Sequence, residues 1–126
     1  MKYKRPTEAE LELLQVLWDH GPCTVREAHN HLRSERGYTT LLKLFQIMFQ
    51  KDLVSRESVG NSHRYSARIT ERENQSGIVD HLVDRVFRQS AHSLVMQALD
   101  RHRASPEELR EIRAMLDSLE TGDENA

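Results

Sequence analysis

Two capping boxes stand within the first thirty residues and mark the starts of two helices. In this motif a Thr hydroxyl and the carboxylate of a Glu three residues later each accept a hydrogen bond from the other residue's backbone N–H. The first box is Thr7-Glu8-Ala9-Glu10, and Gly21-Pro22 ends the helix that it opens. The second box is Thr24-Val25-Arg26-Glu27, and Gly37 closes its helix. The sequence therefore predicts two short helices in close succession.

A third amphipathic segment begins at Thr39 or Thr40 and runs to about Lys51. The apolar residues recur at helical spacing, so that one face of the segment carries Leu41, Leu44, Phe45 and Met48. A third short helix is therefore expected directly after the first two.

The chain then changes from a helical to a strand-like period. Residues 53–59 alternate loosely, Gly60-Asn61 tolerates positive φ, and residues 64–67 can return as a second strand. Two strands alone are only marginally stable in water, so this hairpin must pack against the helices. Three helices closed by a β-hairpin is the element order of a winged helix-turn-helix.

From about Thr70 the pattern is helical again. The last segment opens with a third capping box, Ser105-Pro106-Glu107-Glu108, in which Pro takes the first helical position. Its apolar residues follow at intervals of three, four and three, the spacing of a helix–helix seam. The predicted fold is mainly α with a small β-hairpin: a winged-helix domain over residues 1–69, then a three-helix dimerisation segment over residues 70–126.

The apolar stripes of the C-terminal half are too broad for three short helices to bury alone. Exchange with a symmetry mate solves this problem, so we expect a homodimer. The residues predicted to form the dimer contact are Val83, Val86, Phe87, Leu94, Val95, Leu109, Ile112, Leu116 and Leu119.

Charge is divided unequally along the chain. Residues 1–69 contain 11 Lys/Arg and 8 Asp/Glu, a net +3, whereas residues 70–126 contain 7 and 12, a net −5. Attraction for phosphate is therefore expected in the first half. No apolar run approaches the ~20 residues that cross a bilayer, and the single Cys23 cannot form an internal disulfide. We expect a cytoplasmic protein that does not enter a membrane.

The residue types of an active site are missing from the pattern. We find no nucleophile with its base, no phosphate-binding glycine loop and no metal-ligand cluster, so we predict no enzyme activity, no cofactor and no metal. Asp80, His81 and Asp84 lie close together in the sequence, but such a group is more typical of a charged solvent face than of a metal site.

The order and spacing of these features resemble the penicillinase-repressor family of bacterial regulators, the BlaI/MecI/CopY type. The likeness runs from about Pro6 to Leu119 and includes the Thr7-Glu8-Ala9-Glu10 opening, the Tyr38-Thr39-Thr40-Leu41 start of the third helix and the Ser-Pro-Glu-Glu run. The resemblance implies a homodimeric repressor on a palindromic operator. In several members a membrane-bound sensor protease cuts the repressor, whereas copper-responsive members carry a C-terminal cysteine cluster.

This chain departs from the family pattern at informative positions. Members usually have Thr at Lys43, Arg at Ile47, Gly at Asp52 and Arg at Asn61. The bond that the protease cuts in the resistance repressors aligns with Gln97-Ala98, so that cleavage site is missing, as are the copper cysteines. The DNA-binding class is compatible with these differences, but the inducing signal does not carry over.

A winged-helix repressor reads bases with its third helix and grips the phosphates with the wing and the helix ends. The predicted base-reading residues are Thr39, Thr40, Lys43 and Gln46, and the predicted backbone contacts are Tyr38, Lys51, Arg56, His63 and Arg64. Periodicity alone favours an ordinary solvated face for the first set. The winged-helix order and the family resemblance together favour base reading.

Three apolar residues exceed what the core face of the third helix needs: Leu42, Ile47 and Phe49. They can meet thymine methyl groups, pack against the wing or the C-terminal helices, or contact another partner. The last reading belongs to the alternative function, a winged-helix adaptor that binds proteins and lacks specific DNA binding.

Overall fold

The computed structural model describes residues 5–32 and 35–122, which divide into two compact units. The first unit ends at Asp80 and the second begins at His81. Residues 70–80 therefore group with the N-terminal elements by their contacts. The predicted boundary between a DNA-binding domain and a dimerisation segment at residues 69–70 stays a prediction.

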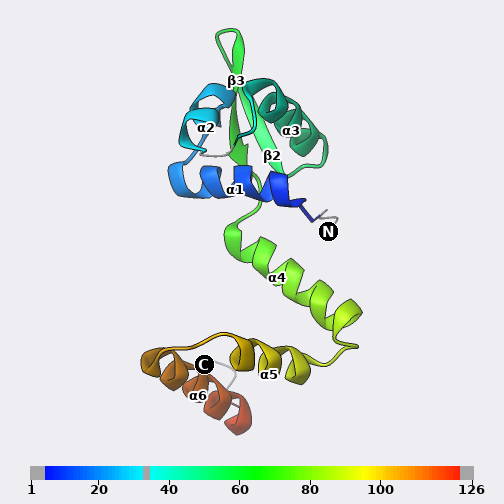
Figure 1. The fold of residues 1–126 in the computed structure, drawn as a ribbon, viewed down its shortest axis with the longest axis vertical. Coiled ribbons are helices and arrows are strands. Elements are labelled where there is room, and N and C mark those ends of the chain that lie inside the picture. The colour runs from blue at the N-terminus through cyan, green and yellow to red at the C-terminus, as the bar shows by residue number, and fades with distance from the viewer. Residues whose placement is uncertain (1–4, 33–34, 123–126) are drawn as a thin grey trace. The chain divides into compact units, whose positions relative to one another are not determined.

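The first unit contains three helices, a three-stranded sheet and a fourth helix (Figure 1). The elements are α1 (Glu8–His20), β1 (Cys23–Thr24), α2 (Val25–His31), α3 (Tyr38–Gln50), β2 (Val54–Val59), β3 (Ser62–Ala67) and α4 (Glu71–His81). The tip of the β2–β3 hairpin extends beyond α2 and α3. The predicted class, mainly helical with a small β-element in winged-helix order, is confirmed.

The predicted capping boxes form as the sequence requires. At α1 the Thr7 N–H donates to Glu10 Oε1 at 2.9 Å and the Glu10 N–H donates to Thr7 Oγ1 at 3.2 Å. At α2 the corresponding distances are 2.9 and 3.1 Å. A further box, which the sequence analysis did not identify, opens α4, where the Thr70 and Glu73 pair makes both bonds.

The sheet has the order β1-β3-β2, with both pairs antiparallel. Its hairpin register runs from Val54 opposite Ala67 to Val59 opposite Ser62, which leaves Gly60-Asn61 as a two-residue turn. Gly60 has a φ of 61°, as the first central position of a type II′ turn demands. The third strand, β1, gives β3 a second partner and so ties the hairpin to the start of α2.

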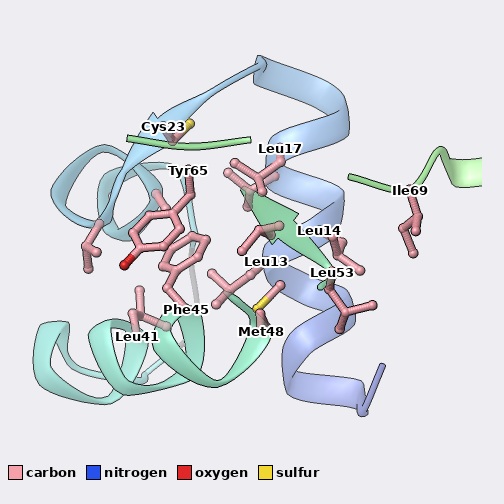
Figure 2. Close-up of a cluster of buried hydrophobic side chains, with 14 residues drawn as sticks. Leu13, Leu14, Leu17, Cys23, Leu41, Phe45, Met48, Leu53, Tyr65 and Ile69 are labelled. Carbon is pink, nitrogen blue, oxygen red and sulfur yellow. The ribbon is translucent and has the colours of Figure 1, made fainter. Parts of the chain in front are cut away.

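The core of the first unit lies between the helices and the sheet. The Phe45 ring of α3 stacks on the Tyr65 ring of β3 with centroids 4.5 Å apart, and Leu13, Leu14 and Leu17 of α1 close the other side (Figure 2). All five side chains are buried. Tertiary packing of this kind supplies the stability that a two-stranded hairpin lacks.

Two polar contacts fasten the edges of this core. The Trp18 indole N–H donates to the backbone carbonyl of Ile69 at 2.9 Å, which joins α1 to the segment after β3. The Lys51 ammonium lies 2.6 Å from the buried carboxylate of Glu10, which joins α1 to the end of α3. The capping bond from the Thr7 N–H and the Lys51 ammonium offset the cost of burying the Glu10 carboxylate.

Asp52 turns the chain from α3 into β2 with a φ of 62°, a left-handed conformation that glycine adopts more easily. We expect Asp52→Gly to raise the free energy of unfolding by about 0.5–1 kcal/mol, because relief of the backbone strain exceeds the added chain entropy. Urea denaturation measures this change. Asp52→Asn is the control, since it tolerates the same φ but loses the exposed 3.5 Å pair with Arg68. Equal stability of the two variants would contradict the prediction.

The second unit continues from α4 through a π-helical turn, η1 (Leu82–Val86), into α5 (Ala91–Arg101) and α6 (Pro106–Thr121). The predicted third capping box is present, with the Ser105 N–H donating to Glu108 Oε1 at 2.8 Å. Arg88 and Gln89 both have positive φ and reverse the chain before Ser90 caps α5. Among the described residues after Asp80, no side chain is buried.

Candidate nucleic-acid interface

The solvent face of α3 holds the four residues predicted to read bases. Thr39, Thr40, Lys43 and Gln46 are all exposed, whereas the opposite face buries Leu41, Phe45 and Met48 completely. The amphipathic period thus orients the four polar side chains away from the core, as expected. Their contact with bases stays a prediction.

The first turn of α3 carries no negative charge. Its N-cap is Gly37, which provides no side-chain hydrogen bond, and its first turn holds no acidic residue. By contrast α1, α2 and α6 each begin with a capping box that brings a Glu carboxylate to the helix start. Among the described residues, neither an N-cap side chain nor a first-turn acid opposes an anion at the positive end of the α3 dipole.

Tyr38 begins α3 with 40% of its surface exposed. The guanidinium carbon of Arg26 lies 5.6 Å from the centre of its ring. Arg26 is exposed on the first turn of α2, so the helix-turn-helix places a cation beside the predicted backbone contact. Arg26 is absent from the set of contacts predicted from the sequence, although its place inside the second capping box puts it at the start of a helix that packs against α3.

The wing residues divide between the two faces of the hairpin. Arg56 lies opposite the buried Tyr65 and therefore faces α3, where its guanidinium carbon is 3.9 Å from the centre of the Phe49 ring. His63 shares this face and forms a T-shaped pair with the Tyr65 ring, with centroids 6.2 Å apart. Arg56 and His63 are thus the two predicted wing contacts that the structure brings to the α3 side.

Arg64 lies on the other face of the hairpin. It pairs in register with Thr24 of β1 and Glu57 of β2. The pKa of the Glu27 carboxyl lies below its usual range, first because the Thr24 backbone N–H donates to it and also because Arg64 places a positive charge nearby. Arg64 therefore lies beside Glu57, on the face of the hairpin opposite to Arg56.

Lys51 is occupied by a structural ion pair. Its side chain is only 20% exposed, and its ammonium contacts Glu10 as described above. This pairing weakens the case for Lys51 as a phosphate contact. No sequence pattern signals the pair, because its members are 41 residues apart.

Comparison with known proteins identifies the family. The sequence profile of the penicillinase repressor family matches residues 6–118. The chain belongs to this family. The protein is accordingly a transcriptional regulator, and the resemblance seen in the sequence is confirmed. No curated protein matches the chain.

The solved structures that match this chain share little sequence identity with it. Reduced AbfR bound to DNA has a TM-score of 0.46 and 17% identity, covering 92% of this chain and 72% of that chain. The transcriptional regulator Tm0710 from Thermotoga maritima has a TM-score of 0.48 and 13% identity, covering 91% and 79%. At such TM-scores these likenesses place no residue of the present protein.

The three extra apolar residues of α3 have different environments in this repressor-family chain. Leu42 packs against the hydrophobic core, and Phe49 lies beneath the Arg56 guanidinium of the wing. Ile47 is 39% exposed and lies one helical turn beyond Lys43 on the same face. Packing against the wing thus accounts for Phe49, whereas Ile47 is partly exposed beside the predicted base-reading residues.

Other binding chemistry finds little support in the part of the chain that the structure describes. There, no three His, Cys, Asp or Glu side chains come together as metal ligands. His20 and His31 stack with ring centroids 3.7 Å apart beside an open pocket, but the pair lies at the ends of α1 and α2 and not on the α3 face. Within the same described residues, no helix has the length and apolar content to cross a membrane.

Proposed function

We propose that the protein is a sequence-specific DNA-binding repressor that acts as a homodimer on a palindromic operator. The observation that carries this proposal is the solvent face of α3, where Thr39, Lys43 and Gln46 stand exposed on a rigid helix. Lys is able to reach guanine acceptors and Gln is able to pair with adenine in a major groove. The start of α3 and the nearby Arg26 and Arg56 supply the phosphate contacts that orient such a helix.

The second unit supports the homodimer. Its described residues bury no side chain, and Leu116 and Leu119 of α6 are 53% and 66% exposed. Met96, Leu99 and Met115 extend this apolar surface beyond the residues predicted from the sequence. Helices that expose so much apolar surface are stabilised when a second copy covers it, and a two-fold dimer matches the symmetry of a palindromic site.

A titration tests the proposal directly. The purified protein is measured against its own upstream intergenic DNA and against a scrambled duplex of equal composition, at two salt concentrations. Preference for the native fragment, with affinity that falls steeply as salt rises, is the expected result because phosphate contacts release counterions. Equal and feeble binding to both duplexes would refute specific DNA binding and favour the protein-binding adaptor.

Lys43 is expected to carry base preference. Lys43→Ala should relax the preference at one position of each half-site by about 1–3 kcal/mol, the value of one good direct contact to a base. A scan of single base-pair substitutions measures this change. Arg56→Ala is the control: loss of a phosphate contact weakens all duplexes alike and lowers the salt slope by about one. Unchanged base preference in Lys43→Ala would remove this residue from the reading face.

A further inference from the structure

Ile47 interrupts an otherwise polar surface. A helix turns by about 100° per residue, so Ile47 lies about 40° around the axis from Lys43, between Lys43 and Thr40, and Gln46 lies on the far side of Lys43. All three of these neighbours are exposed. Ile47 is the large aliphatic residue of α3 that is exposed, because Leu41 is buried and Leu42 and Leu44 pack against the core.

Phe49 differs from Ile47 in what its side chain contacts and not in how much of it is exposed. Phe49 is exposed to a similar extent, but the Arg56 guanidinium stacks on its ring. The two side chains leave the helix in different directions, since residues two apart are separated by about 200°. Phe49 therefore serves the joint between α3 and the wing, whereas Ile47 belongs to the surface that the proposed function turns toward the DNA.

An aliphatic side chain in a major groove suits one base in particular. Thymine alone presents a methyl group there, whereas guanine and adenine present acceptors and cytosine presents an amino donor. Isoleucine has no side-chain polar atom, so it would cover those acceptors or that donor without replacing the water that they lose. Such an unpaired polar group opposes binding.

We propose that Ile47 reads the 5-methyl group of a thymine in each operator half-site; this inference rests on the proposed function. Ile47 follows Lys43 by four residues, a rise of about 6 Å, which corresponds to roughly two base-pair steps. The thymine is therefore expected within two base pairs of the base that Lys43 contacts. Apolar contact with one base and a hydrogen bond to another then act together along one face of α3.

The test removes the methyl group and nothing else. Each thymine of the shortest upstream duplex that the protein prefers over scrambled DNA is replaced in turn by deoxyuridine, and affinity is measured for the wild type and for Ile47→Ala. In the wild type, one substitution per half-site should weaken binding about fourfold, the effect of one buried methyl group. In Ile47→Ala that penalty should vanish, while the penalties at other positions persist.

Two controls make the outcome specific. Thermal unfolding should show that Ile47→Ala stays folded and loses less stability than truncation of a fully buried residue, because 39% of the Ile47 surface is exposed. Gln50→Ala, an exposed change at the end of the same helix, should keep every deoxyuridine penalty. Retention of all penalties in Ile47→Ala, with the operator still preferred, would overturn the inference and leave the repressor function intact. If the wild type showed no preference for upstream DNA over scrambled DNA, both the Ile47 inference and the proposed repressor function would be overturned. The exposed Ile47 would then indicate a contact with another protein.

Discussion

Replacing Leu116 with glutamate is expected to yield monomers and to lower operator affinity by about 100-fold or more, because two linked half-site contacts become independent. Leu116 belongs with Ile112 and Leu119 to the proposed dimer contact on α6, called here the α6 seam, and half of its surface is exposed in the single chain. In a two-fold interface each substitution occurs twice. Two unpaired carboxylates would then have to be buried against apolar surface, which opposes association strongly.

Sedimentation and operator titration together measure this effect. The matched control is Ala114→Glu, which adds the same charge to the opposite side of α6, where the chain is also exposed. The control should remain dimeric and keep its operator affinity. Dimers of Leu116→Glu at the wild-type association constant would show that the contact between copies lies outside the α6 seam.

The helix starts and the core could be predicted from the sequence because local rules determine them. A capping box depends on residues three apart, and both N-terminal boxes form with short reciprocal bonds. Helical spacing likewise predicted which face of α3 holds Phe45 and Met48, both of which are fully buried. The Thr70 and Glu73 box follows the same rule, so the signal for the start of α4 was present in the sequence although it was not used.

The finer parts of the interface depend on contacts between distant segments. Alternation within β3 separates neighbours such as His63 and Arg64, but only the register shows that Arg64 faces Glu57 and the start of α2. The pairing of Lys51 with Glu10 likewise requires the packing of α1 on α3. A sequence pattern identifies cations near a proposed reading helix, whereas the tertiary structure decides which of them already have a partner.

The same reasoning applies to the apolar residues of α3. Leu42, Ile47 and Phe49 look equivalent in the sequence, since each exceeds the expected core face. The structure separates them through the core contact of Leu42 and the Arg56 guanidinium over Phe49. Of the three, only Ile47 lies among the exposed polar side chains of α3. The structure therefore singles out Ile47 as the apolar residue proposed to contact a base.

Truncation of Phe45 is expected to have the largest effect on stability. Phe45→Ala should lower the free energy of unfolding by about 3–5 kcal/mol, because it removes a buried aromatic side chain and leaves a cavity. The Phe45 ring is fully buried and stacks on Tyr65, so its loss loosens α3, the proposed reading helix, from β3 of the wing.

Urea denaturation followed by helical circular dichroism measures the loss, and Phe49→Ala is the matched control. Both variants remove a phenyl ring from the same helix, but the Phe49 ring is partly exposed and should cost less than about 2 kcal/mol, including its contact with Arg56. Similar losses in the two variants would contradict the assignment of Phe45 to the core.

A domain of this size has a total stability of about 5–15 kcal/mol, so Phe45→Ala should also leave a measurable unfolded fraction and reduce the active protein in an operator titration. Phe49→Ala should instead act on DNA binding through the position of Arg56, with the folded fraction nearly unchanged.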